Sequence, residues 1–441
     1  MIGSGSNIRR RVVQHDFYET ADQVSGVVLL NNPSNGPWEY EEYLRLLILK
    51  RYTDAHPKQV TSSSRCYFIC ADGAYPVLKA YVKRQQLQRN CFHLFGYFPL
   101  CDAVIGDMDS YTSSYELDGC QKPPSTPEGG YDTVNDIPTE VIDTIRRISE
   151  FTAAHFLEIN GKIQDASFGE WEGMRGENTG LLLSPPWLQL RCQLTTDFKK
   201  SLMLLSRLCR YHSDGPVAIL PPVLRSADGA KLLKTGGRAV GMQTNGSDND
   251  DARECELCLE ASRVEAVVLP TFVAIGAFGG RFDHEMGAVS TMFSVSDEAH
   301  VVLVDSTNTV FACQPNGWTQ IVWQPQYEGK TCGLINYGRM LECETSGLQW
   351  DIVKGRGRPS VTENLVFGFD EFLSVCNAVR REVVTVDLRQ LAPSTTASSG
   401  GGKKDVAMTC DCHDRSQKRS SPPVLFSIIR RQVRGDTDQM S

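Results

Sequence analysis

Short apolar runs alternate with stretches of helical periodicity along the first quarter of the chain. The apolar runs have the length of buried parallel strands and lie at residues 27–30, 66–70 and 103–106. Helices are predicted between them, over residues 40–51 and 75–86. Because strands that alternate with helices favour a parallel sheet, this part of the chain predicts an α/β domain with a Rossmann-like layout.

The α/β pattern returns near residue 264 and then changes. Residues 264–275 form a strand-like run that leads into a glycine-rich turn and a helix. From 301 to 388 the chain consists of short β-like segments separated by turns, which predicts a separate all-β domain. The predicted organisation is therefore a leader over 1–25, an α/β domain over 26–298, an all-β domain over 299–391 and a tail over 392–441.

Two irregular stretches interrupt the α/β domain, at about 111–190 and 213–262. The first is acidic and rich in loop-forming residues, although it contains the periodicity of an amphipathic helix over 141–151. We interpret both stretches as insertions. The tail becomes rich in Ser, Thr and Gly after Pro393 and is predicted to be mostly disordered, with an apolar run at 424–429 as a candidate docking segment.

Composition narrows the class of protein. The 441 residues carry a net charge of −8, which argues against a sequence-independent nucleic-acid binder. No apolar run approaches the roughly 18 residues of a membrane span, and the basic N-terminus lacks the apolar stretch of a secretory signal. The fifteen cysteines are therefore expected to be reduced thiols in a cytoplasmic protein.

Two cysteine-containing segments leave zinc binding open as an alternative. Cys255 and Cys258 form one Cys-x-x-Cys pair, and Cys410, Cys412 and His413 cluster near the C-terminus. A zinc site requires four ligands in matching pairs, and neither segment has an obvious second half.

Acidic residues follow the apolar run at 103–106. Asp107 and Asp109 stand one residue apart after a glycine, where an open α/β sheet binds its ligands. Two carboxylates with no basic residue in the segment would repel each other unless a cation lies between them. Oxygen ligands suit Mg²⁺ better than Zn²⁺. The alternative is a strand-end turn in which Asp and Ser make local hydrogen bonds.

Two further motifs suit phosphate chemistry. Gly276, Gly279 and Gly280 lie at a strand-to-helix turn, where backbone N–H groups can approach a phosphate, and Arg281 adds a planar donor. Their spacing is not the dinucleotide fingerprint, so no nicotinamide cofactor is implied. Asp197 and Lys200 stand three residues apart at the start of a helix and can face the same side. The alternative for the glycines is a tight turn that serves packing. The alternatives for Asp197 and Lys200 are an ordinary acidic residue at a helix start and a solvated lysine.

The motifs occur in a definite order. They are Ala71-Asp72-Gly73-Ala74, Gly106-Asp107-Met108-Asp109-Ser110, Thr196-Asp197-Phe198-Lys199-Lys200 and Gly279-Gly280-Arg281-Phe282-Asp283-His284, followed by Thr331-Cys332-Gly333, Thr345-Ser346-Gly347-Leu348-Gln349-Trp350 and Phe372-Leu373-Ser374-Val375-Cys376-Asn377. This ordered set resembles thiamine pyrophosphokinase, which makes thiamine diphosphate from thiamine and ATP. The resemblance covers about 26–110, 190–212 and 264–390 and excludes both insertions, the leader and the tail.

The resemblance implies an N-terminal α/β nucleotide-binding domain and a C-terminal all-β sandwich that binds thiamine. It also implies a homodimer with active sites between subunits, Mg²⁺ as cofactor, and transfer of a diphosphoryl group from ATP to the thiamine hydroxyl with release of AMP. By motif match, the metal ligands are Asp107, Asp109 and Asp197. The ATP-binding residues are Asp72, Gly73, Gln193, Lys200, Gly279, Gly280 and Arg281, and the thiamine-binding residues are Trp350, Ser374 and Asn377. The catalytic set is Asp72, Asp107, Asp109, Asp197, Lys200, Arg281 and Asp283.

The chain departs from the family pattern in three places. Ala74 stands where the family usually has glycine, and Cys376 stands where it often has serine. The insertion at 111–190 directly follows the acidic motif, which suggests a lid or a regulatory surface over the nucleotide. Trp350, taken alone, also fits a core residue of the all-β domain. Two other functions remain as alternatives: a metal-dependent phosphohydrolase that uses the same carboxylates, and a non-catalytic thiamine or nucleotide sensor of the same fold.

Overall fold

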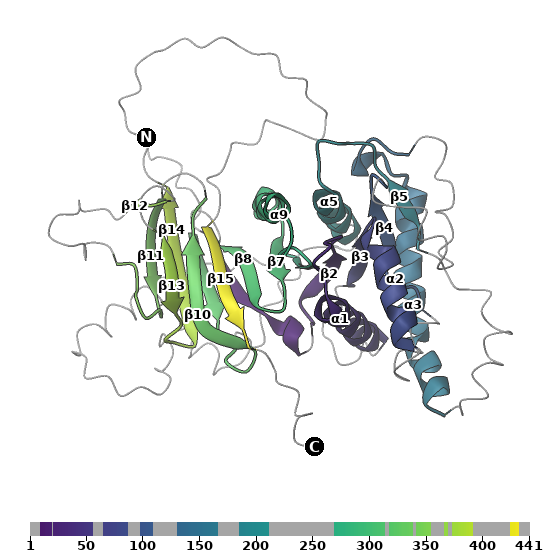
Figure 1. Ribbon diagram of the computed structural model, residues 1–441, viewed down its shortest axis with the longest axis horizontal. Helices are drawn as coiled ribbons and strands as arrows, with labels where there is room; N and C mark the ends of the chain where they lie inside the picture. The colour runs from purple at the N-terminus through teal and green to yellow at the C-terminus, as the bar shows by residue number, and fades with distance from the viewer. Residues whose placement is uncertain are drawn as a thin grey trace, which may run out of the picture. The chain divides into compact units, whose positions relative to one another are not determined.

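The structure is a computed structural model, drawn in Figure 1. It describes residues 9–19, 21–55, 65–86, 98–108, 130–165, 185–210, 269–313, 317–337, 341–353, 366–368, 373–390 and 424–431. The chain divides into two compact units, which are treated separately below. The α/β unit comprises described residues within His15–Ile219, Val268–Phe311 and Arg430–Ser441, and the β unit comprises those within Met1–Gln14 and Ala312–Ile429.

The α/β unit contains a mainly parallel sheet. Its strands are β2 (Val24–Leu29), β3 (Tyr67–Ala71), β4 (Ala103–Gly106), β5 (Trp187–Gln189), β6 (Thr271–Ile275), β7 (His300–Val304) and β8 (Asn308–Cys313). They lie in the order β8-β7-β6-β2-β3-β4-β5, and only β8 runs antiparallel to its neighbour β7 among them. Every residue of β2, β3, β4 and β7 is buried, as expected for parallel strands covered on both faces.

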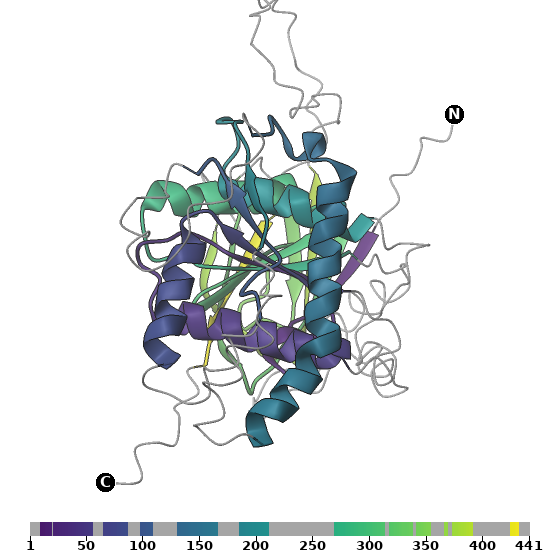
Figure 2. The same cartoon turned by 90° about the vertical axis from the view of Figure 1, so that its right-hand side faces the viewer.

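Helices cover this sheet (Figures 1 and 2). They are α1 (Pro37–Ala55), α2 (Ala74–Gln86), α3 (Thr139–Asp165), α5 (Asp197–Arg210) and α9 (Phe282–Ser294), with short 3-10 turns η1 (Asp16–Tyr18) and η5 (Val134–Asp136). Helix α5 packs on β2, β3 and β4, and α1 packs on α3. Figure 2 shows α1 and α3 crossing each other. The apolar face of α5 lies against the sheet, since Leu202, Leu205 and Leu208 are fully buried.

The stretch predicted as an insertion at 111–190 contributes to the α/β unit. Helix α3 is 27 residues long and extends well beyond the predicted 141–151, and Ile142, Ile145 and Ile148 on it are buried. Arg207 Nη1 also donates to the main-chain oxygens of Val134 (2.7 Å) and Ile137 (2.8 Å). The described part of this stretch therefore belongs to the core packing of the α/β unit.

In the described part of the β unit, one sheet has the order β1-β9-β14-β11-β12. Among the other strands of this unit, β10 lies between β13 and β15. The strands are β1 (Arg9–Gln14), β9 (Gly317–Val322), β10 (Glu328–Ile335), β11 (Leu341–Ser346), β12 (Val366–Phe367), β13 (Ser374–Ala378), β14 (Val383–Gln390) and β15 (Val424–Arg430).

Two predicted boundaries differ from the structure. Within the predicted leader, β1 pairs in parallel with β9. In the tail, which is predicted to be mostly disordered, the candidate docking segment at 424–429 lies in the strand β15. The unit boundary falls inside β8, between Phe311 and Ala312, because β7 joins the parallel sheet through β6. Local sequence favours a strand but does not specify which distant strand it pairs with.

Of the helices in the described part of the chain, none combines the length and apolar character that crossing a membrane requires.

Candidate functional site

Three carboxylates converge at one edge of the parallel sheet. Asp72 follows β3, Asp107 follows β4, and Asp197 begins α5. Strands β3 and β4 are adjacent and parallel, with Ala71 opposite Ile105, so the residues after them emerge side by side. One carboxylate oxygen of each aspartate lies within 4.8 Å of the others. The acidic motifs that the sequence analysis singled out are thus brought together by strand pairing.

The close approach of these strands depends on a glycine. A Cβ atom added to Gly106 would lie 2.7 Å from Cβ of Asp72, a distance that side chains do not tolerate. Asp72 is 1 % exposed, and its Oδ1 accepts a hydrogen bond from the N–H of Gly73. Beyond Asp107, Met108 has a φ of 65°, which reverses the chain in a conformation that non-glycine residues seldom adopt.

The lysine of the third motif is directed at the acidic cluster. Lys200 is 2 % exposed, and its Nζ lies 2.8 Å from Oδ1 of Asp197. Thr196 caps the helix, because its Oγ1 accepts from the N–H of Lys199 at 3.2 Å. The three carboxylates together form an oxygen-only donor set of the kind that a hard divalent cation prefers.

The glycine turn follows β6 in the same unit. Gly276 and Gly279 have φ values of 87° and 84°, which glycine adopts readily. The N–H groups of Gly279 and Gly280 donate to Oε1 of Glu285, at 2.9 and 3.3 Å. The turn therefore holds an anionic group on two backbone donors, and in this structure that group is the chain's own carboxylate.

Arg281 and Asp283 form an exposed pair beside this turn. Nη2 of Arg281 lies 2.5 Å from Oδ2 of Asp283, and the side chains are 67 % and 63 % exposed. The hydrogen bond from Arg281 lowers the pKa of Asp283 below its usual value, and its own pKa rises in return. Both groups remain charged at neutral pH and accessible to a ligand.

Trp350 lies at the surface of the β unit and is not the core residue that its apolar ring alone suggested. Its side chain is 64 % exposed. Its main chain is held by the buried Asn377: the N–H of Trp350 donates to Oδ1 (3.2 Å), and Nδ2 of Asn377 donates to the Trp350 oxygen (2.9 Å). The same Nδ2 donates to Oγ of Ser374 at 2.9 Å. Ser374 and Asn377 thus fix the segment that presents the indole.

A carboxylate completes this support. Asp351 accepts hydrogen bonds from Oγ1 of Thr345 (3.0 Å) and from the N–H groups of Leu348 (3.0 Å) and Gly347 (3.2 Å). Gly347 has a φ of 90°, and a Cβ there would lie 2.5 Å from the Val383 oxygen. The turn before Trp350 is therefore specified by glycine and by side-chain hydrogen bonds.

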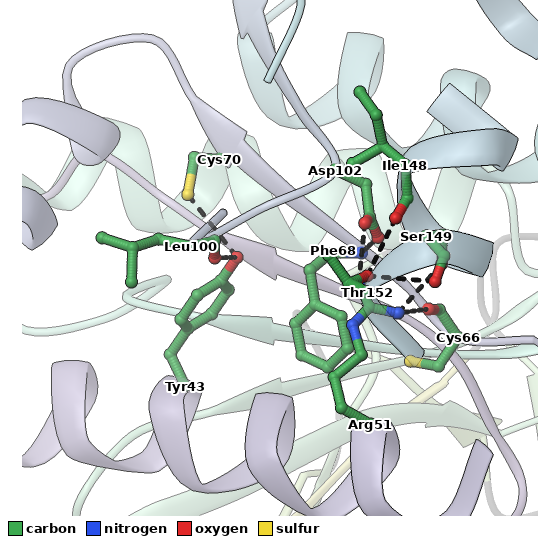
Figure 3. A network of polar contacts seen from close by, with 10 residues as sticks. All are labelled: Tyr43, Arg51, Cys66, Phe68, Cys70, Leu100, Asp102, Ile148, Ser149 and Thr152. Carbon is green, nitrogen blue, oxygen red and sulfur yellow. Dashed lines mark hydrogen bonds and ion pairs between the residues drawn. The ribbon is translucent and has the colours of Figure 1, made fainter. Parts of the chain in front are cut away.

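A second polar network in the α/β unit was missed by the sequence analysis (Figure 3). Nη2 of Arg51 lies 2.6 Å from Oδ1 of Asp102, and Nη1 donates to Oγ of Ser149 at 2.9 Å. Burial raises the pKa of Asp102, while the Arg51 guanidinium opposes that shift. Asp102 directly precedes the apolar run of β4, but no sequence signal links it to Arg51.

The remaining predicted residues are distributed as follows. Gln193 is exposed in the turn before α5. Asp109 lies outside the described residues, as do Cys255, Cys258, Cys410, Cys412 and His413. The residues that the sequence analysis overlooked are Asn32, Arg51, Asp102 and Glu285; Asn32 alone carried a signal, as a polar residue just beyond a predicted strand.

Comparison with known proteins agrees with the motif order. Residues 319–391 match the family model described as thiamin pyrophosphokinase, vitamin B1 binding domain. Thiamine pyrophosphokinase 1 of Arabidopsis thaliana is 29 % identical over 153 residues, which are 34 % of this chain and 53 % of the relative. Thiamin pyrophosphokinase 1 of Caenorhabditis elegans is 29 % identical over 131 residues, which are 30 % of this chain and 50 % of the relative. The chain spans about half the length of these curated relatives.

Among solved structures, thiamin pyrophosphokinase from Candida albicans aligns with a TM-score of 0.45 at 14 % identity, over 98 % of this chain and 96 % of that one. The yeast thiamin pyrophosphokinase aligns with a TM-score of 0.43, also at 14 % identity, over 96 % and 91 %. The matched family model and the curated relatives show that the chain is similar to thiamine pyrophosphokinases over part of its length, in agreement with the resemblance of its motifs.

Proposed function

We propose that the protein is a thiamine diphosphokinase, which transfers a diphosphoryl group from ATP to the hydroxyl of thiamine and releases AMP. The observation that carries the proposal is the convergence of Asp72, Asp107 and Asp197, with the buried Lys200 paired to Asp197. Phosphoryl-type transfer depends on positioning and on neutralising charge, and this cluster offers both.

The acidic cluster fits Mg²⁺. Three carboxylates within 4.8 Å form a hard, oxygen-only donor set, and the sequence places Asp109 next to them. Asp72, Asp107 and Asp197 would hold the ion, with Asp109 as a further ligand. Bound there, Mg²⁺ would neutralise phosphate charge and align the ATP phosphates.

The chain's own groups account for the rest of the reaction. The thiamine hydroxyl oxygen forms a bond to the β-phosphorus of ATP, and the bond from that phosphorus to the oxygen bridging to the α-phosphorus breaks, so that AMP leaves with the bridging oxygen. The hydroxyl proton passes to a carboxylate of the acidic cluster. Lys200 and Arg281 supply positive charge to the phosphates, and the N–H groups of Gly279 and Gly280 supply neutral donors.

Trp350 is the proposed partner of thiamine. The thiazolium ring is a cationic aromatic, which the face of an exposed indole attracts. Ser374 and Asn377 hold the segment that carries the indole. In this proposal they both contact thiamine and keep Trp350 in position.

The proposal extends to the organisation of the protein. We assign nucleotide binding to an α/β domain with a Rossmann-like sheet and thiamine binding to a β-sandwich domain. We further propose a cytoplasmic homodimer with active sites between subunits. Sedimentation or size-exclusion measurements of mass test the dimer directly.

The decisive experiment incubates the purified full chain with thiamine, ATP and Mg²⁺ and resolves AMP, ADP and thiamine diphosphate by chromatography. Asp107→Asn tests the acidic cluster. Asp297→Asn, an exposed aspartate beyond the end of α9, is the matched control.

Equal amounts of AMP and thiamine diphosphate, lost in Asp107→Asn and retained in Asp297→Asn, support the proposal. Inorganic phosphate or ADP without thiamine diphosphate would instead indicate a phosphohydrolase. Thiamine binding without any product would indicate a sensor.

A further inference from the structure

The segments after β2 and β6 meet at the edge of the sheet that bears the acidic cluster. Strands β2 and β6 are adjacent and parallel, with Leu29 opposite Ile275, and the N–H of Leu30 donates to the Ile275 oxygen at 2.9 Å. Asn32 follows the first strand, and the glycine turn at 276–280 follows the second. Two segments that are more than 240 residues apart in sequence are thereby brought into contact.

The side-chain amide of Asn32 binds the glycine turn. Its Nδ2 donates to the main-chain oxygens of Gly276, at 3.1 Å, and Phe278, at 2.8 Å. Its Oδ1 accepts from the N–H of Ser34 at 2.9 Å, which fixes the orientation of the amide. A single side chain therefore holds two alternate carbonyls of the turn.

The turn fits closely around this amide. A Cβ added to Gly280 would lie 2.5 Å from Oδ1 of Asn32, and one added to Gly276 would lie 2.6 Å from Oδ1 of Asn35. A side chain at 276 or 280 would therefore displace the amide of Asn35 or Asn32 from its present position. The asparagine amides therefore give a reason for glycine at these two positions that does not depend on a ligand.

The other polar groups of the turn face an anion. The N–H groups of Gly279 and Gly280 donate to the Glu285 carboxylate, and Arg281 follows directly. With its carbonyls bound by Asn32, the turn cannot rotate its peptides without losing two hydrogen bonds. The N–H donors of Gly279 and Gly280 are therefore held in place before a ligand binds. This preorganisation lowers the free-energy cost of binding a charged ligand.

We propose that Asn32 is a positioning residue for nucleotide binding: it fixes the turn at 276–280 so that the N–H groups of Gly279 and Gly280 and the Arg281 guanidinium are set to receive phosphate oxygens of ATP. The inference rests on the proposed function for the identity of the anion. A purely structural role for Asn32 would change stability without a selective effect on ATP.

The test compares three variants of the full chain. Asn32→Asp preserves size and the acceptor for Ser34 but removes both donors, and Asn32→Ala removes the amide without adding charge. Asn31→Asp places the same charge on the exposed neighbouring residue and is the control. The measurements are the Kd of Mg-ATP by calorimetry, the KM for ATP and for thiamine, and amide hydrogen exchange over residues 276–285.

We expect both Asn32 variants to raise the Kd and KM for ATP by about tenfold, the effect of losing two hydrogen bonds. The KM for thiamine should stay within about twofold, and exchange over the turn should speed up. Asn31→Asp should resemble the natural chain in all readouts.

Unchanged ATP affinity in both Asn32 variants would overturn the inference, as would an equal rise in both KM values. A natural chain that binds no ATP would overturn the proposed function itself and the nucleotide role of Asn32 with it. Hydrogen exchange separates these failures, because it reports whether Asn32 holds the turn even when no nucleotide binds.

Discussion

The Arg51 guanidinium and the Asp102 carboxylate form a fully enclosed ion pair, with Nη2 2.6 Å from Oδ1 and side-chain exposures of 4 % and 0 %. Oδ2 of Asp102 also accepts from the N–H of Phe68 at 2.8 Å, so the carboxylate ties α1 to both β3 and the start of β4. Ser149 of α3 binds the other side of the guanidinium (Figure 3). The pair therefore anchors the start of β4, the strand that ends directly before Asp107.

Breaking this pair should destabilise the fold strongly. Asp102→Ala leaves the Arg51 charge buried without its counter-ion, which costs about 3–5 kcal/mol. Urea denaturation measures the loss. The double variant Arg51→Met with Asp102→Leu removes both charges and should recover most of the stability. If Asp102→Ala lowered the free energy of unfolding by less than about 1 kcal/mol, the ion pair would behave like a solvent-exposed one, which would contradict its burial.

Lys200 should be required for turnover and its neighbour should not. Lys200→Gln keeps the length of the side chain but removes the charge that Asp197 faces, and a group of this kind contributes about 10²–10³ in kcat. Lys199→Gln is the matched control on the next residue of the same helix. Steady-state kinetics with thiamine and ATP provide the comparison. Similar losses in both variants would show that Lys200 has no special role.

Replacing Glu285 should tighten ATP binding. Its carboxylate occupies the N–H groups of Gly279 and Gly280, so a phosphate must displace it. Glu285→Gln removes the charge and should lower the Kd for ATP by about threefold, which is the size of an exposed charge interaction. Glu298→Gln, beyond the end of α9, is the control. Weaker ATP binding in Glu285→Gln would mean that the carboxylate supports the turn instead of competing for it.

Cys376 should be the thiol that reports on thiamine. It is exposed, and it stands between Ser374 and Asn377 on β13. We expect iodoacetamide to label it before the buried thiols Cys332 and Cys343, and thiamine to slow the labelling at least several-fold. Peptide mass spectrometry measures the modification. Labelling at the same rate with and without saturating thiamine would place the ligand elsewhere.

Alkaline pH should lower the free energy of unfolding through the buried thiols. Burial raises the pKa of Cys313 from 9.0 to about 12, so the thiol stays protonated in the folded chain while it ionises in the unfolded chain. Between these two values the unfolded state binds fewer protons, and stability falls by at most ~1.4 kcal/mol per pH unit for this group. Cys313→Ala should therefore show a shallower loss between pH 9 and pH 11, measured by urea denaturation. Identical slopes would contradict the assignment.

Much of the chemistry could be predicted from local sequence. Asp72 and Asp107 were recognisable because each directly follows an apolar run, and the carboxyl ends of parallel strands are where α/β sheets bind ligands. The glycine turn after β6 and the pair Asp197 and Lys200 were candidates from their spacing, and the order of the motifs along the chain selected them. These are short-range relationships, and backbone geometry transmits them directly into the structure.

The tertiary structure decided which of these segments meet. Strands pair through backbone groups that every residue carries. No side-chain pattern therefore predicted that β1 pairs with β9 or that β7 enters the parallel sheet. The contacts of Asn32 with Gly276 and of Arg51 with Asp102 arise only after distant segments are brought together. The sequence by itself thus determined the elements and the chemically active residues at their ends. Folding decided their partners, because long-range packing selects among pairings that are locally equivalent.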